Sequence, residues 1–226
     1  MDAKQRAGEA ALGHVKDGMI VGLGTGSTAR FFIEGVGAAV RAGKLRDIRA
    51  VPTSVNSEKL ARQAGLPVVT FGQITKIDLT VDGADEVAPD LSLIKGLGGA
   101  LLREKLVAQN SSKFIVIADA SKLVTKLGTK SPLPVEVTPF GFEASERFLR
   151  DLGCRPTLRR NPNGEIFITD NSNYIFDCNF TEIADPRELN LKLAPRAGIV
   201  ESGLFIDLAH IAIIADNQAV WTIARP

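Results

Sequence analysis

Three acidic side chains follow one apolar run, in the stretch VDGADEV (81–87), where Asp82, Asp85 and Glu86 lie within five residues of one another. Carboxylates can bind sugar-like hydroxyl groups or act as general acids and bases. In an open α/β sheet, ligands bind beyond the carboxyl ends of the strands, so Asp82 and Asp85 are expected to meet polar substrate atoms. The alternative is an ordinary polar turn with solvated carboxylates.

A second chemical stretch, KGLGGALLREK (95–105), follows shortly afterwards. Lys95 precedes Gly96, Leu97, Gly98 and Gly99, whose glycines permit a tight loop that exposes backbone N–H groups. A helix is expected next, with Leu101, Leu102, Leu106 and Val107 as core positions. Glu104 falls about one turn into this helix and could face the loop. For a helix glutamate taken alone, an exposed position beside Arg103 or Lys105 is the better expectation.

The glycine-rich stretch GLGTGSTA (22–29) suggests anion binding, because a strand–loop–helix unit aims free N–H groups and the positive helix end at an anion. Ser27 and Thr28 are expected to cap the helix and to donate hydroxyl hydrogen bonds. Ser27 stands where a dinucleotide fingerprint has its third glycine, no acid ends the next strand, and no Gly-Lys-Ser/Thr follows. The loop therefore fits one small phosphate better than a nucleotide, although a simple tight turn is the alternative. Lys122, in IADASKLV, follows another strand and could meet a phosphate.

The elements that must position these groups alternate along the first half of the chain. Apolar runs typical of strands alternate with helical stretches, which indicates a parallel sheet covered on both faces. The expected strands are 19–24, 48–54, 67–71, 76–85 and 113–119, and the expected helices are 27–43, 56–65 and 100–111.

The pattern changes near residue 131. A helix over 143–153, a β-hairpin within 155–180 that turns at 161–164, a further strand and a helix over 185–198 predict a smaller α+β unit. The apolar run 211–215 is expected to rejoin the first sheet. The fold expected is thus a Rossmann-like, mostly parallel sheet with helices on both faces, over 1–130 and 206–226. A smaller α+β, ferredoxin-like domain over 131–205 is inserted before the C-terminal strand and is expected to serve oligomerisation.

Composition narrows the classes of function. The 226 residues carry a formal net charge of +1, which gives no electrostatic push toward nucleic acid or an anionic membrane. No apolar run approaches the ~18 to 20 residues that cross a bilayer. The two cysteines form no metal-like spacing and no signal peptide is visible, so a cytoplasmic location is expected. With only His14 and His210 in unrelated segments, a metal site is not expected.

Taken together, the motifs resemble a known family. GTGSTA (24–29), DGADE (82–86), KGLGGALLREK (95–105), ADASK (118–122), TDNSNYIFD (169–177) and GIVESGLF (198–205) together resemble ribose-5-phosphate isomerase A. The resemblance runs nearly end to end, and the order and spacing of the motifs make it specific.

The resemblance implies interconversion of D-ribose 5-phosphate and D-ribulose 5-phosphate in the non-oxidative pentose phosphate pathway, without metal or other cofactor. Glu104 would be the general base in a cis-enediol mechanism, Lys95 would stabilise the enediolate, and Asp82 and Asp85 would bind hydroxyls, one of them helping ring opening. The phosphate would meet Lys122 and Lys4. It also implies a homodimer or larger oligomer, with no nucleic-acid or membrane partner. The expected substrate-binding residues are Thr25, Gly26, Ser27, Thr28, Asp82, Gly83, Ala84, Asp85, Lys95, Gly96, Leu97, Gly98, Lys122 and Lys4.

Two departures and two rival functions stand beside this interpretation. Ser172 replaces a glycine that the family often has in its asparagine motif, and His210 stands where a small or polar residue is usual. One rival is acyl or CoA transfer with Glu104 or another carboxylate as nucleophile. The other is a sugar-phosphate sensor, which would need an output module, yet the sequence has no DNA-binding helix pair and no basic arm.

Overall fold

The computed structural model describes residues 2–225 and divides into two compact units. The first unit comprises Met1–Ala84, Arg103–Leu123 and Asp207–Pro226, and the second comprises Asp85–Leu102 and Val124–Ile206. The expected small domain, 131–205, lies wholly within the second unit. That unit also takes in 85–102, whose short strands pair with a strand near residue 205, and 124–130, whose backbone N–H groups donate to Val87 and Glu86.

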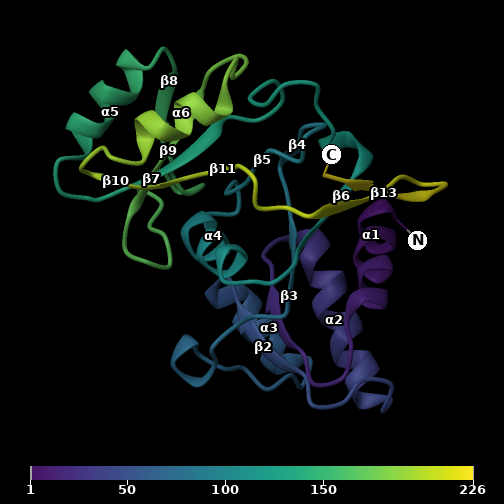
Figure 1. Cartoon of the computed structure of the whole chain (residues 1–226). Coiled ribbons are helices and arrows are strands. Elements are labelled where there is room, and N and C mark those ends of the chain that lie inside the picture. Colours follow the sequence, from purple (N-terminus) through teal and green to yellow (C-terminus); the bar gives the residue numbers. More distant parts are fainter. Residues whose placement is uncertain (1, 226) are drawn as a thin grey trace. The chain divides into compact units, whose positions relative to one another are not determined.

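The first unit is built on a six-stranded sheet in the order β13-β12-β6-β3-β1-β2 (Figure 1). Neighbouring strands are parallel except for the antiparallel pair β12–β13. Because β12 pairs in parallel with β6, the end of the chain rejoins the first sheet as expected. The strands are β1 (Ile20–Leu23), β2 (Arg49–Pro52), β3 (Leu79–Gly83), β6 (Phe114–Asp119), β12 (Ile211–Ala215) and β13 (Val220–Ala224).

Helices cover both faces of this sheet. On one face, residues of the side-by-side helices α1 (Ala3–Ala10) and α2 (Ser27–Arg41), together with α3 (Val55–Gln63), pack on a core that includes Val21, Val81 and Ile117 (Figure 1). On the other face, Val107 of α4 (Leu101–Gln109) packs against alternate positions such as Ile20 and Val51. This division follows from the alternation of side chains along each strand.

Local sequence explains where two of these helices begin. Asp2 caps α1, where its Oδ1 accepts a hydrogen bond from the Gln5 N–H at 2.8 Å. Ser54 and Ser57 form a reciprocal capping box at the start of α3. Each cap satisfies N–H groups that the first helical turn leaves without a partner in the helix.

The second unit contains a ferredoxin-like β-α-β-β-α-β arrangement, as expected. Its antiparallel sheet has the order β10-β7-β9-β8, and a separate three-stranded sheet has the order β11-β5-β4. The core of the sheet and its helices includes Leu133, Val135, Phe176 and Leu189. The elements are β4 (Glu86–Val87), β5 (Leu93–Ile94), β7 (Leu133–Val137), α5 (Phe142–Asp151), β8 (Arg155–Leu158), β9 (Tyr174–Asn179), α6 (Pro186–Leu193), β10 (Ile199–Ser202) and β11 (Leu204–Phe205).

Two expected elements differ from the structure. The stretch 67–71 forms no strand: only Val68 bridges to Ala50, and a short 3-10 helix (Phe71–Gln73) follows. The turn at 161–164 is present, but only a single bridge, Arg160 to Ile166, flanks it, and the main partner of β8 is β9. In both places β-type side chains occur without a neighbouring strand in register to complete a ladder.

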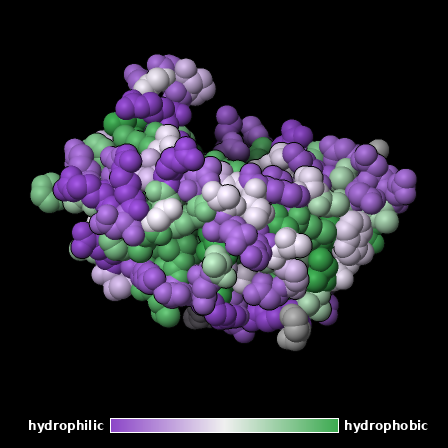
Figure 2. Space-filling view, turned by 90° about the horizontal axis from the view of Figure 1, so that it is seen from above, coloured by the Kyte–Doolittle hydropathy of each residue, from purple (hydrophilic) through white to green (hydrophobic). Residues whose placement is uncertain are grey.

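Among residues 2–225, no helix has the length and apolar character needed to cross a bilayer. The face drawn in Figure 2 mixes hydrophilic and hydrophobic residues over its area.

Candidate active site

The glycine loop after β1 is tied to the carboxylate that ends β3. The Thr25 N–H donates to Asp82 Oδ1 at 2.9 Å, and the Gly83 N–H donates to the same oxygen at 2.7 Å. β1 and β3 are neighbours in the sheet although they are far apart in sequence, so these two loops meet at the carboxyl edge. Asp82 is buried, at 1% exposure. The first unit therefore fixes a carboxylate against the loop that was expected to bind an anion.

Gly24 is required by this close approach. A Cβ at position 24 would lie 2.1 Å from Asp82 Oδ1 and 2.5 Å from Asp82 Cα. The loop is also held from the side of β2, because the Thr25 hydroxyl bonds with the hydroxyls of Thr53 at 2.8 Å and Ser54 at 2.7 Å. No role was expected for Thr53 and Ser54, which directly follow β2.

The expected helix cap at this loop is wrong. Gly26, with φ of 105°, occupies the N-cap of α2, and no side-chain cap bond is present there. Ser27 is consequently the first helical residue, with an exposed side chain, and Thr28 is partly exposed. The physical reason is that only glycine adopts this positive φ without strain, so the chain turns one residue earlier than expected.

Glu104 is buried rather than exposed, at 5% exposure in the first turn of α4. A carboxylate in this turn is favoured by the positive end of the helix dipole. Two expected core leucines behave differently: Leu106 is 46% exposed and Leu102 is partly exposed, whereas Leu101 and Val107 are buried as expected. Lys105 is also buried, at 5% exposure, so the inward face of α4 carries charged side chains.

Lys4 and Lys122 line the same cavity of about 510 Å³ in the first unit. Lys122 lies in a short 3-10 helix directly after β6. Residues that follow β12 also line the cavity, which places it at the same edge of the sheet as Asp82. Three acidic residues line it too, and their carboxylates cap local backbone N–H groups. These are Asp2 at Gln5, Asp119 at Ser121, and Asp216 at Gln218 and Ala219.

The hydrogen bonds from Ala219 and Gln218 lower the pKa of Asp216 below its usual value. One oxygen of each acid thus accepts local backbone hydrogen bonds, and the lining of the cavity combines these three carboxylates with the two lysines.

Asp85 and the lysine–glycine loop lie in the second unit. The Leu97 N–H donates to Asp85 Oδ2 at 3.0 Å, and the Gly99 N–H donates to the Gly96 carbonyl at 2.9 Å. The expectation that this loop exposes its backbone N–H groups is thus wrong for Leu97 and Gly99. The Leu97 N–H is taken by the Asp85 carboxylate, and the positive φ values at Gly96 (102°) and Gly99 (80°) turn the Gly99 N–H back onto Gly96.

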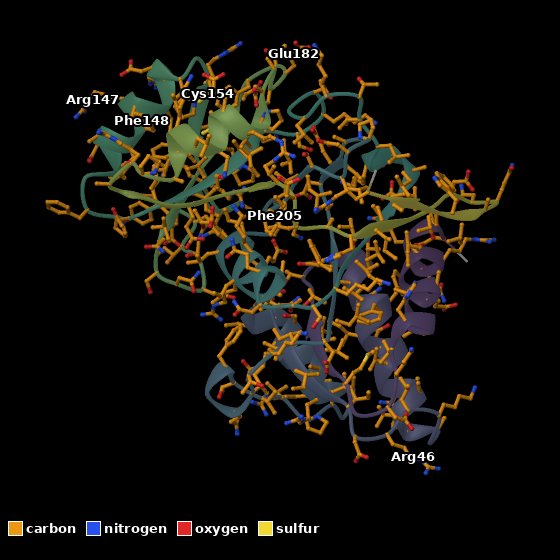
Figure 3. The ribbon with its side chains drawn as sticks, viewed as in Figure 1. Arg46, Arg147, Phe148, Cys154, Glu182 and Phe205 are labelled. Atoms are coloured by element: carbon orange, nitrogen blue, oxygen red, sulfur yellow. The ribbon has the colours of Figure 1, made fainter. Side chains whose placement is uncertain are left out.

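Lys95 is nearly enclosed, at 2% exposure. Its backbone N–H donates to the Gly203 carbonyl at 2.9 Å, and its Nζ lies 5.4 Å from the ring centre of Phe205, which is labelled in Figure 3. An ammonium group within about 6 Å of a ring centre is attracted to the ring face, which favours this position of Nζ.

Two further buried carboxylates in the second unit anchor loops. Glu86 accepts hydrogen bonds at 2.6 Å from the N–H groups of Gly128, Lys130 and Ser131. Glu136 Oε1 accepts from the Thr169 hydroxyl at 2.9 Å and the Asn173 amide at 2.8 Å. Sequence reasoning missed Glu136 because its partners lie more than thirty residues away.

The two departures from the expected motifs have structural explanations. Ser172 adopts a positive φ of 63°, in the left-handed region that glycine occupies without strain. His210 Nδ1 accepts a hydrogen bond from the Phe114 N–H at 3.0 Å and so secures the segment before β12 to β6. Among the described residues, no group of three or more His, Cys, Asp or Glu side chains is arranged to hold a metal ion.

Comparison with known proteins places this geometry in context. Residues 49–219 match the model of the family described as ribose 5-phosphate isomerase A (phosphoriboisomerase A). The chain is 48% identical over 223 residues to the ribose-5-phosphate isomerase A of Roseiflexus sp. strain RS-1, covering 99% of this chain and 96% of that protein. It is 48% identical over 221 residues to the protein of that name from Bacillus mycoides, covering 97% and 98%.

Solved structures agree with these sequence relatives. A D-ribose-5-phosphate isomerase in complex with phospho-erythronic acid superimposes with a TM-score of 0.96 at 39% identity, over 100% of both chains. The ribose 5-phosphate isomerase of Plasmodium falciparum superimposes with a TM-score of 0.93 at 42% identity, over 98% of this chain and 97% of that one.

Proposed function

Because the chain belongs to the ribose 5-phosphate isomerase A family, we propose that it interconverts D-ribose 5-phosphate and D-ribulose 5-phosphate through a cis-enediolate, with Glu104 as the base. The observation that carries the proposal is the buried glutamate in the first turn of α4, within a chain that matches this family over nearly its full length. The reaction needs neither metal nor cofactor in this scheme.

The proton steps balance with one carboxylate. Glu104 removes the proton from C2 of the open-chain aldose, the electrons form a C1–C2 double bond, and negative charge develops on O1. The protonated Glu104 then returns the proton to C1 while a proton moves from O2 to O1, which leaves the ketose. Acid–base catalysis of this kind contributes roughly 10²–10⁴-fold to the rate.

The enediolate requires donors that are in place before the charge develops. We assign this role to the Lys95 ammonium group, which is supported by its burial beside Phe205. Asp82 and Asp85 bind sugar hydroxyls, and one of them assists ring opening. Asp82 is suited to a fixed acceptor role because two backbone N–H groups hold its carboxylate.

Lys122 and Lys4 bind the phosphate of the substrate, which is supported by the cavity that they share. The glycine loop with Thr25 to Thr28 binds substrate at the same edge of the sheet. Phosphate binding holds the substrate by a group remote from C1 and C2, and this orients the reacting carbons. The phosphate end of the substrate then supplies the affinity, and the C1–C2 end reacts. We further propose that the protein acts in the cytoplasm as a homo-oligomer.

The direct test measures ketopentose formation from ribose 5-phosphate in the presence of EDTA. Turnover unaffected by EDTA is expected, and absence of turnover at high enzyme concentration would rule out the proposed function. Phospho-erythronic acid, which a relative binds, should inhibit competitively.

Glu104→Gln tests the base. It should lower kcat by roughly 10²–10⁴-fold and leave inhibition by inorganic phosphate unchanged, because the amide cannot carry the proton. Glu143→Gln, in the exposed first turn of α5, is the matched control and should keep wild-type kcat. Full activity of Glu104→Gln would refute the assignment.

A further inference from the structure

The guanidinium group of Arg159, just after β8, contacts the loop that follows Lys95. Its Nη1 donates to the Gly96 carbonyl at 3.0 Å and to the Leu97 carbonyl at 3.1 Å. These are the carbonyls of the two residues that directly follow Lys95. The side chain of Arg159 is only 11% exposed, so the guanidinium group itself is largely shielded from water. All of these residues belong to the second unit.

Arg159 is itself held in a fixed plane. Its Nε donates to Asp177 Oδ2 at 2.9 Å and its Nη2 donates to Asp177 Oδ1, which is the two-pronged arrangement that suits a guanidinium and a carboxylate. The Arg159 guanidinium carbon also lies 5.6 Å from the ring centre of Phe167. Phe167 in turn packs on the loop, since a Cβ at Gly99 would lie 2.5 Å from its ring.

Hydrogen bonds therefore hold the loop after Lys95 from two sides. Asp85 accepts from the Leu97 N–H, while Arg159 donates to the carbonyls of Gly96 and Leu97. Gly96 has a φ of 102°. A glycine without such restraints can adopt many other backbone conformations. Without these bonds the peptide groups after Lys95 could rotate. A group that stabilises developing charge must be held within about 0.5 Å of its productive position.

We propose that Arg159, oriented by Asp177, is a positioning residue for the isomerisation, which holds the Lys95–Gly99 loop in the geometry that stabilises the enediolate. The inference rests on the proposed function. Arg159 touches neither substrate nor reacting atoms in this scheme; it acts through the two carbonyls. A lysine at this position could not serve both carbonyls and both carboxylate oxygens, because its ammonium is a point charge without the planar fork.

The experiment compares wild type with Arg159→Ala, Arg159→Lys and Asp177→Asn, using full-length protein. Steady-state kinetics with ribose 5-phosphate should show a kcat lowered about 10- to 100-fold in both Arg159 variants, since a misplacement near 1 Å costs about that much. KM and the inhibition constant of inorganic phosphate should change less than threefold. Asp177→Asn should show a smaller loss in the same direction. Arg150→Ala, which removes an exposed ion pair with Glu146 on α5, is the control and should match wild type.

Hydrogen–deuterium exchange supplies a readout independent of activity. The amides of Leu97 and Gly99 are hydrogen-bonded within the protein, so peptides covering 95–102 should exchange faster in Arg159→Ala, while peptides from α5 should not. A purely structural role would instead lower the melting temperature and raise exchange throughout the second unit.

The outcomes separate the two proposals. If the wild type does not turn over ribose 5-phosphate, the proposed function fails, and the positioning role fails with it. If the wild type is active and Arg159→Ala keeps wild-type kcat, only the positioning role is overturned. Arg159→Lys with wild-type kcat would also overturn it, because charge alone would then suffice. If activity in all three variants falls only in proportion to the folded fraction, the role is structural and the proposal is wrong.

Discussion

The contact between Gly24 and Asp82 gives a sharp test of how the first unit is built. In Gly24→Ala, the new Cβ would lie 2.1 Å from Oδ1, 2.4 Å from Cγ and 2.5 Å from Cα of Asp82. Ordinary carbon contacts begin near 3.5 Å, so the two segments must separate by about 1 Å. Because the Cα atom of Asp82 is among the atoms met, rotation of its side chain alone cannot relieve the overlap.

The expected cost has two parts. Overpacking of this kind destabilises by about 1–3 kcal/mol, which lowers the melting temperature of a chain this size by about 2–12 °C. Displacing the Asp82 carboxylate and the Thr25 N–H by about 1 Å should lower kcat/KM about 100-fold. The kinetic loss should therefore persist at temperatures well below the unfolding transition.

The assay is ketopentose formation from ribose 5-phosphate, with thermal unfolding followed by circular dichroism on the same preparations. Gly13→Ala is the matched control, because a Cβ there meets no atom within 4 Å, and it should behave as wild type. If Gly24→Ala keeps kcat/KM within twofold of wild type, the Gly24–Asp82 approach does not position the site and the reasoning fails.

Three further predictions concern single residues. Lys122→Ala should raise KM at least tenfold with little change in kcat, since it removes a charge from the cavity proposed to bind the phosphate; an unchanged KM would contradict the proposed role of Lys122. Ser172→Gly should raise the free energy of unfolding by up to about 1 kcal/mol, because a left-handed conformation costs a non-glycine residue about 1–2 kcal/mol and the greater chain entropy of glycine offsets part of the relief. Calorimetry should show a melting temperature about 2–4 °C higher, and a lower one would refute backbone strain at Ser172. Burial, with a smaller effect of Lys113, lowers the pKa of His14 from 6.5, so the unfolded chain binds more protons than the folded chain around that pH and the free energy of unfolding should rise with pH up to about 6.5. His14→Gln should flatten this dependence in urea titrations, and an unaltered pH profile would exclude the contribution of His14.

Much of the sheet was predictable because buried strands have a local signature. The apolar runs that became β1, β3, β6 and β12 predicted both the strands and the edge where the polar groups gather. The stretch 67–71 is also rich in β-branched and aromatic residues but pairs at one position only, since a strand needs a partner that its own sequence does not specify.

The site was predictable where it depends on chain order and unpredictable where it depends on distant partners. Asp82 follows a strand, and its place at the edge of the sheet follows from that. No local pattern in the sequence predicted that Glu104 is buried. Hydrophobicity does not indicate the buried face of this helix, because Leu106 is exposed while the charged Lys105 is buried. Arg159 contacts carbonyls more than sixty residues away, so no spacing in the sequence could connect it with the Lys95 loop.

Burial alone does not identify the base among the carboxylates of this chain. Glu86 is fully buried, yet three N–H groups at 2.6 Å engage its two oxygens, so it is committed to holding a loop. Asp82 is nearly as buried, and its Oδ1 receives two backbone N–H groups that fix it as an acceptor. Donors on both of its oxygens thus commit Glu86 to the loop, whereas the backbone donors to Asp82 reach Oδ1 alone and leave it suited to binding substrate hydroxyls.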